Sequence, residues 1–292
     1  MKKRNPNFRK DKKVQTGNRF KREKEDFRER KFNNPQPPKY SEKPAKAPNE
    51  KSDDGLIRLN RYISNAGVCS RRDADKLISA GEISVNGKVI TELGFKVKRD
   101  DKIKHKGKLL KREKPVYVLL NKPKGFITTM EDPKGRRTIM ELVKHAGEER
   151  IYPIGRLDRE TTGLIMLTND GDLAKELAHP SGKTQKIYHV ELDKAITDRD
   201  FQTIVNREFE LEDGPVDLDG INVISDDRKK LGVELHSGRN RIVRRMFAHF
   251  GYEVVKLDRT VFAGLTKIDL PRGKWRYLNE KELRRLKHFN KV

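Results

Sequence analysis

The uneven distribution of apolar residues limits what this chain can fold into. Between residues 1 and 54 the scattered apolar side chains follow no period of 2 or 3.6, whereas they recur at regular spacing in 56–103 and again in 115–286. A segment that buries no apolar face cannot offset the entropy lost on ordering. We therefore predict a disordered tail over 1–54 followed by two folded domains, for which 292 residues leave enough room.

The charge balance indicates a polyanionic partner. The formal net charge is +23, and residues 1–54 hold 18 Lys and Arg against 9 Asp and Glu, with 6 of the 13 prolines. Nucleic acid is the first expectation and an anionic membrane the second. No apolar run approaches the roughly 18 residues that a spanning helix needs, and no apolar stretch follows Met1–Lys10 to make a secretory signal. We expect a cytoplasmic protein whose tail either attracts RNA or keeps the chain soluble.

Residues 56–103 predict a small module of two helices and a hairpin. Apolar residues at helical spacing from Leu59 to Ala66 predict a helix that ends at Gly67. Ser70 is expected to cap a second helix, and Asn86-Gly87 predicts a tight hairpin turn. Basic residues lie outside the apolar face, where they either solvate the module or contact RNA phosphates; we favour the phosphates. They are Arg58, Arg61, Arg71, Arg72, Lys76 and Lys88.

Residues 115–286 interleave predicted strands and helices at hairpin-like spacing. The expected strands are 116–120, 164–168, 187–192 and 231–235, and helices are expected to begin near Thr138, Asp172, Thr197 and Arg241. This order predicts an α+β fold with a mixed, largely antiparallel sheet and flanking helices.

The main candidate for chemistry is Asp158 in the stretch GRLDRETTGL, where it lies between Arg156 and Arg159. A carboxylate flanked by arginines is either a structural ion pair or a catalytic group kept ionised by its neighbours. The chain has no glycine-rich nucleotide loop, and its seven histidines show no metal-ligand spacing. His179 or His189 could act as a base, but a lone histidine is more often structural. Cys69 is the only cysteine, which excludes a disulfide framework and a cysteine metal cluster, and its position inside the small module 56–103 favours a core role over a nucleophilic one.

A basic helix is expected from Arg241 to Phe250. It brings Arg241, Arg244 and Arg245 within about one turn, so that one arginine can face a pocket and the others the RNA backbone. The alternative is a solvated helix face. The adjacent Gly238-Arg239 makes us favour a role in the pocket and in RNA binding over a merely solvated helix face.

The segment Arg58–Ile90, RLNRYISNAGVCSRRDADKLISAGEISVNGKVI, resembles an S4 domain, a small RNA-binding module. The resemblance runs through both helices and the VNG turn. It implies that the module grips structured RNA by shape and backbone and is not itself an enzyme.

The segment Gly155–Ser181, GRLDRETTGLIMLTNDGDLAKELAHPS, is similar to the core motif of pseudouridine synthases of the RsuA/RluB type. LLNKPKG, 119–125, precedes it, and KIYHVEL, 186–192, and HSGRNRIVRRMFAHFGYEVVKLDRT, 236–260, follow it in the family's order. The resemblance therefore implies an S4 domain followed by a pseudouridine synthase domain.

The same resemblance assigns roles to residues. It implies that Asp158 is the catalytic nucleophile, that Tyr188 packs against the target base, and that Arg244 forms an ion pair with Asp158. Arg241-Ile242 departs from the His-Gln of many relatives, which weakens any role tied to those two positions. We also expect RNA contacts from Arg156, Arg239, Arg241 and Arg245.

The reaction that this resemblance implies converts uridine into pseudouridine without redox change or loss of atoms, so we expect neither metal nor cofactor. Attack at C1′, addition to the uracil ring and a glycal route all stay open. A uridine within a duplex must be flipped out or lie in a loop. The resemblance further implies a monomer.

Two rival functions remain for comparison. A non-catalytic RNA-binding ribosome-assembly factor would suit the S4 module, the tail and the charge, but leaves the joint match of Asp158, Tyr188 and Arg244 unexplained. An S4-bearing rRNA methyltransferase would need a cofactor-binding glycine loop that the sequence lacks. Within the pseudouridine synthases, LEDGPV and GRNRIVRRM resemble the large-subunit enzymes more than the small-subunit one. We thus expect 23S rRNA as substrate, with 16S rRNA as the alternative.

Overall fold

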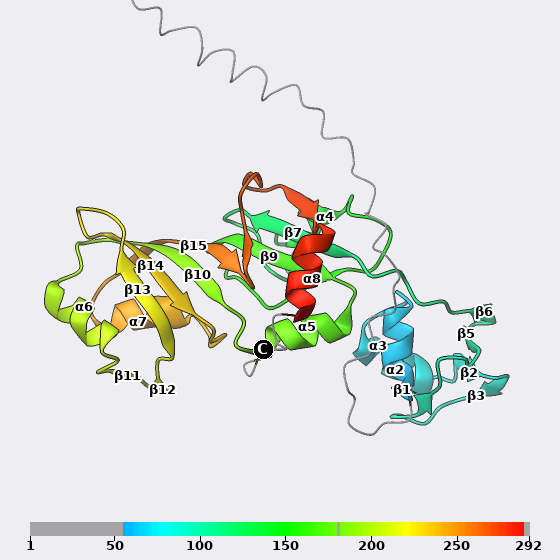
Figure 1. The fold of residues 1–292 in the computed structure, drawn as a ribbon. Helices are drawn as coiled ribbons and strands as arrows, with labels where there is room; N and C mark the ends of the chain where they lie inside the picture. The colour runs from blue at the N-terminus through cyan, green and yellow to red at the C-terminus, as the bar shows by residue number, and fades with distance from the viewer. Residues whose placement is uncertain (1–54, 180–181, 289–292) are drawn as a thin grey trace, which may run out of the picture. The chain divides into compact units, whose positions relative to one another are not determined.

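The computed structural model describes residues 55–179 and 182–288 (Figure 1). The predicted tail, 1–54, lies outside the described residues. Within those two ranges no helix is both long and apolar enough to cross a membrane.

The first domain contains two helices and short strands, as predicted. Ser70 Oγ accepts a hydrogen bond from the Asp73 amide and so caps the second helix. Asn86 and Gly87 both have positive φ, +50° and +88°, as the tight turn between two short strands requires. The sheet continues past the predicted boundary at residue 103. Its elements are β1 Ile57–Arg58, α2 Leu59–Asn65, α3 Arg71–Ser79, β2 Ile83–Val85, β3 Lys88–Val89, β4 Lys96–Val97, β5 Ile103–His105 and β6 Lys108–Leu109.

The second domain is built on a nine-stranded sheet. Its elements are β7 Tyr117–Lys122, α4 Ile139–Val143, β8 Tyr152–Pro153, β9 Thr162–Thr168, α5 Gly171–Ala178, β10 Lys186–Leu192, α6 Asp198–Val205, β11 Glu210–Leu211, β12 Gly214–Pro215, β13 Leu218–Val223, β14 Lys230–Leu235, α7 Ile242–His249, β15 Val254–Phe262, β16 Leu265–Thr266, β17 Trp275–Tyr277 and α8 Glu280–His288. β11 and β12 form a separate hairpin.

The strand order is β13-β14-β10-β15-β9-β7-β17, with β16 beside β15 and β8 beside β9. Within the described chain β15 and β9 run parallel, and the other paired strands run antiparallel. The α+β fold with a mixed, largely antiparallel sheet is therefore confirmed.

Strand β9 is buried on both faces, which explains its continuous apolar sequence. Leu164 and Met166 pack with residues of α5 and α8, whereas Ile165 and Leu167 pack on the other face with residues of α4. A separate core joins α6 and α7 to β10, β13 and β14. Figure 1 shows this second group of elements at one end of the sheet.

Local capping signals in the sequence correctly located two helix starts. At α4, Glu141 accepts a hydrogen bond from the Thr138 amide at 2.7 Å, which completes a capping box. At α6, Thr197 Oγ1 accepts from the Asp200 amide at 3.1 Å. The predicted basic helix is confirmed as α7, which ends before Gly251 at φ +74°.

Candidate active site

Asp158 lies in the loop between β8 and β9, and a buried lysine shapes that loop. Lys122, at the end of β7, is fully buried. Its Nζ donates to the main-chain carbonyls of Pro123, Asp158, Arg159 and Thr161 at 3.2, 3.0, 3.2 and 2.8 Å. Burial lowers the pKa of Lys122 to about 8, and the carboxylate of Asp158 opposes that shift. The sequence singled out Lys122 only as part of the motif 119–125, after the expected strand 116–120, and this role was missed.

A threonine fixes the backbone just before Asp158. Thr128 Oγ1 donates to the Leu157 carbonyl at 2.8 Å and accepts from the Leu157 amide at 3.2 Å. On the other side of Asp158, the Gly125 amide donates to the Arg159 carbonyl at 2.9 Å. The segment that follows β7 therefore holds the loop on both sides of the carboxylate.

Gly163 joins this loop to the centre of the sheet. In the parallel pair β9–β15 it lies opposite Arg259, and its φ is +106°. A Cβ at this position would lie 2.2 Å from the Arg259 carbonyl oxygen. Only glycine allows the two strands to approach so closely, so the sequence Thr-Gly-Leu after Asp158 is a packing requirement.

Asp158 shares a cavity of about 180 Å³ with Tyr188. Tyr188 lies on β10 beside a register shift between Ile187 and Tyr188, and its ring packs against two of the core clusters. Neither His179 nor His189 lines this cavity. The polar and charged side chains that line it include Asp158, Tyr188, Arg156, Lys186, Arg239, Arg241 and Arg259.

Lys186 connects the strand of Tyr188 to the loop that precedes α7. Its Nζ donates to the carbonyls of Thr184 and His236 at 3.0 and 2.5 Å. Burial, together with the nearby positive charge of Arg259, lowers the pKa of Lys186 to about 8. Two lysines with lowered pKa values therefore support the cavity from different strands.

The ion pair of Asp158 differs from the predicted one. Arg241, not Arg244, lies next to the carboxylate, with Nη1 3.4 Å from Asp158 Oδ2. Arg244 instead donates from Nη1 to the Val254 carbonyl at 2.7 Å, and its buried Nε has no hydrogen-bond partner. The reason is geometric: Arg241 caps α7 at the cavity, whereas Arg244 projects towards the start of β15. Burial and Arg241 lower the pKa of Arg244, and Asp158 opposes that shift from nearby.

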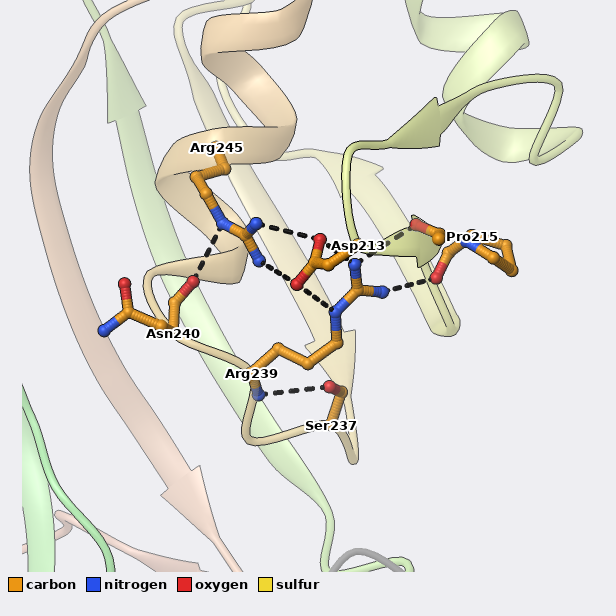
Figure 2. A network of polar contacts seen from close by, with 7 residues as sticks. Asp213, Pro215, Ser237, Arg239, Asn240 and Arg245 are labelled. Carbon is orange, nitrogen blue, oxygen red and sulfur yellow. Dashed lines mark hydrogen bonds and ion pairs between the residues drawn. The ribbon is translucent and has the colours of Figure 1, made fainter.

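Arg239 and Arg245, both predicted to contact RNA, direct their guanidinium groups at Asp213 (Figure 2). Arg156 is exposed at the cavity. In the first domain Arg58, Arg71, Arg72 and Lys88 are exposed, Arg61 is partly buried, and Lys76 pairs with Asp73 at 2.8 Å. Cys69 packs against the core of that domain, where burial raises the pKa of its thiol.

Among the residues that the structure describes, no three His, Cys, Asp or Glu side chains lie close enough together to hold a metal ion.

An S4 domain followed by a mixed sheet whose cavity is lined by Asp158 and Tyr188 is the arrangement that the sequence resemblance implies for a pseudouridine synthase, and comparison with known proteins identifies the class. The sequence model described as "RNA pseudouridylate synthase" matches residues 116–249, and the S4 domain model matches residues 57–103. This chain belongs to the RsuA/RluB family of RNA pseudouridine synthases and is an enzyme of that class.

Individual relatives support the assignment. The chain is 43% identical over 236 residues to ribosomal large subunit pseudouridine synthase B of Bacillus subtilis (strain 168), covering 80% of this chain and 96% of the relative. It is 38% identical over 243 residues to the dual-specificity RNA pseudouridine synthase RluF of Escherichia coli (strain K12), covering 79% and 78%. A crystal structure of a pseudouridylate synthase matches with a TM-score of 0.55 and 27% identity, covering 79% of this chain and 99% of that one.

Proposed function

We propose that this pseudouridine synthase isomerises one specific uridine of 23S ribosomal RNA and that Asp158 is its catalytic carboxylate. The observation that carries the proposal is the shared cavity: Asp158, Tyr188 and Arg241 come from three separate segments and line one space of about 180 Å³. The ribosomal large-subunit substrate named for the Bacillus subtilis relative supports the choice of RNA.

The reaction needs a group that acts at the sugar while the base is detached. The N1–C1′ bond breaks, the uracil turns, and a C5–C1′ bond forms; the proton lost from C5 is balanced by the proton gained at N1. An ionised carboxylate near C1′ acts as nucleophile or as a stabilising anion in this sequence. Lys122 and Thr128 hold the backbone around Asp158, so its position is fixed before substrate arrives.

Tyr188 provides a surface for the detached base. Stacking of an aromatic ring on a base contributes roughly 1–3 kcal/mol to binding. It uses the flat face of the base and not its edges, so it persists when the base turns in its own plane. Such a surface suits a base that must turn between the two bonds. A target uridine held in a duplex has to be flipped into the cavity, and the exposed Arg156 at its edge is placed to contact the backbone of the extruded nucleotide.

The charge of Asp158 is balanced by Arg241, with Arg244 behind it. Arg241 Nη1 lies 3.4 Å from Asp158 Oδ2, close enough to balance the negative charge of the carboxylate. Arg244 lies outside the cavity lining and donates to the Val254 carbonyl, so its charge acts on Asp158 only from a distance. The exposed basic residues of the S4 domain bind the surrounding RNA. That the protein is a monomer and that it is cytoplasmic remain predictions.

Pseudouridine mapping of ribosomal RNA tests the proposal. Cells that lack the protein are compared with cells in which wild type or the Asp158→Asn variant has been restored. One site in 23S rRNA should disappear and return only with wild type. A site in 16S rRNA would replace the proposed substrate by the small subunit. An unchanged map would favour an RNA-binding assembly factor that acts without isomerising rRNA.

A further inference from the structure

Asp213 occupies the tip of the hairpin between β11 and β12, where two arginines bind it (Figure 2). Arg245 donates from Nη1 and Nη2 to the two carboxylate oxygens at 2.8 Å each. Arg239 donates from Nε at 2.9 Å and makes a second contact through Nη2. These two guanidinium groups hold the pKa of Asp213 far below its usual range.

The arginines also bind the main chain on both sides of the network. Arg239 Nη1 donates to the Pro215 carbonyl at 2.5 Å, and its Nη2 donates to the Gly214 carbonyl at 3.1 Å. Arg245 Nε donates to the Asn240 carbonyl at 2.9 Å. The hairpin is thereby tied to the loop 237–241 that lines the cavity of Asp158.

Arg241 lies between these two arginines in the sequence and has a strained backbone. Its φ and ψ are +45° and +31°, a left-handed conformation that an arginine rarely adopts. Such a conformation persists only where the surroundings impose it. The Arg241 carbonyl accepts from the Arg245 amide at 2.9 Å, and the Arg239 carbonyl accepts from the Ile242 amide at 3.4 Å. The conformation directs Arg241 Nη1 to within 3.4 Å of Asp158 Oδ2.

We propose that Asp213 is a positioning residue for the reaction: by holding Arg239 and Arg245 it fixes the left-handed turn that places Arg241 against Asp158. The inference rests on the proposed role of Asp158. It also reassigns Arg239 and Arg245, since most of their N–H groups are already bound within the protein and are not free for RNA phosphates.

The first test compares Asp213→Asn, which keeps the shape but removes the charge, with Glu212→Gln on the same hairpin tip. Asp213→Asn should lower kcat on the target RNA by about 10- to 100-fold, because small displacements in an active site have effects of this size. KM should stay within about two-fold, since RNA contacts elsewhere are intact. Glu212→Gln should match wild type, and Asp213→Glu, which retains the charge, should recover part of kcat.

A double-mutant cycle shows whether Asp213 acts through Arg241. In an Arg241→Ala background, Asp213→Asn should reduce kcat by less than about two-fold, because the side chain that it positions is absent. Multiplicative losses in the double variant would overturn the proposal. So would tighter RNA binding with a steeper salt dependence and an unchanged kcat in Asp213→Asn, which would make Asp213 a stand-in for an RNA phosphate.

Hydrogen exchange in the absence of RNA separates this inference from the proposed function. The amides of Ile242 and Arg245 should exchange faster in Asp213→Asn than in wild type, while amides of β9 should be unchanged. Unchanged exchange at Ile242 and Arg245 overturns the positioning role. If wild type fails to isomerise any RNA, the proposed function fails, and the exchange result still decides whether Asp213 sets the turn.

Discussion

Lys122 links the buried core to the candidate catalytic residue more directly than any other side chain around Asp158. A lysine at a fully buried position is stable only if its ammonium is compensated, and here four main-chain carbonyls do so. Two of those carbonyls belong to Asp158 and its neighbour Arg159. The charge of Lys122 therefore orients the loop of Asp158, whereas its side chain does not line the cavity.

The lowered pKa of Lys122 makes its contribution to stability depend on pH. Between about pH 8 and 10.5 the unfolded chain binds a proton at Lys122 that the folded protein has released, so folding stability rises with pH in this window. Relative to Lys122→Met, the free energy of unfolding of wild type should increase by about 1–2 kcal/mol from about pH 7.5 to about pH 10, after allowance for solvent screening. Denaturant unfolding of both proteins at both pH values measures this change in the free energy of unfolding.

The pKa of Lys186 is also lowered, but Lys186 is present in both wild type and Lys122→Met, so its effect on stability cancels in that comparison. At every pH Lys122→Met should also be less stable than wild type by about 1–3 kcal/mol, because buried carbonyls lose their donor. A wild-type minus variant difference that stays constant from pH 7.5 to pH 10 would show that Lys122 keeps its proton throughout.

Substitution of the carboxylate separates catalysis from binding. Asp158→Asn should abolish isomerisation and leave RNA affinity nearly unchanged, because the amide keeps the shape but cannot act as an anion or nucleophile. Single-turnover assays and filter binding on the same RNA measure the two effects. Equal losses of binding and activity would count against a catalytic role for Asp158.

Residue-level chemistry was only partly predictable from sequence. The structure brings Asp158 and Tyr188, both singled out by the motifs, to one cavity, but the ion pair expected of Arg244 is made by Arg241. That difference depends on the left-handed backbone of Arg241, which no local propensity for arginine suggests. Lys122 was missed because lysine favours the surface. The one available signal was its position at the end of an apolar strand, directly before proline.

At the scale of elements, the close contact of β9 and β15 determines whether the loop of Asp158 is held in place. Gly163→Ala places a Cβ 2.2 Å from the Arg259 carbonyl oxygen at a positive φ, so the strands must separate. The variant should lose at least about 1–3 kcal/mol of stability and most activity. Gly264→Ala is the matched control: its φ is also positive, +72°, but its Cβ meets nothing within 4 Å.

Thermal and denaturant unfolding of both glycine variants measure the difference. Gly264→Ala should lose about 1 kcal/mol from backbone strain alone. Equal losses at the two positions would mean that β9 and β15 move apart without strain, and that positive φ accounts for the whole requirement at Gly163.

Elements with a local signal were predicted well, and those that depend on distant contacts were not. Three helix starts were predicted from capping residues next to them, and the structure confirms the caps at Ser70, Thr138 and Thr197. Strand β15 was absent from the predicted set, although it joins β10 to β9 at the centre of the sheet. Charged residues interrupt its apolar pattern: Lys256 is exposed, whereas Asp258 is half-buried and Arg259 is buried in the middle of the strand.

At the scale of the whole molecule, recognition combines the S4 domain with a large excess of positive charge. The net charge of +23 includes +9 from residues 1–54. Charge attracts any polyanion, so selection among RNAs has to come from shape and from specific contacts. Composition could predict a nucleic-acid partner, but only ordered motifs could predict the reaction, because net charge carries no information about chemistry.

Deletion of residues 1–54 should weaken RNA binding mainly at low salt. The tail contributes counterion release, so its loss should reduce the slope of log K against log salt by about 0.7–0.9 for each phosphate contact removed. Single-turnover isomerisation at saturating RNA should be unchanged, since the cavity residues all lie beyond residue 150. Titrations at several salt concentrations measure the slope for the full chain and for the deletion.

A full-length variant with every Lys and Arg of 1–54 replaced by Gln provides the matched control. It removes the same 18 positive charges as the deletion but keeps the chain and its 9 acidic residues, so its slope should be no steeper than that of the deletion. Retention of the wild-type slope in the Gln variant would show that the tail binds RNA through contacts other than charge. A deletion with the wild-type slope would show that residues 1–54 take no part in RNA binding, and that the solubilising role is the one they serve.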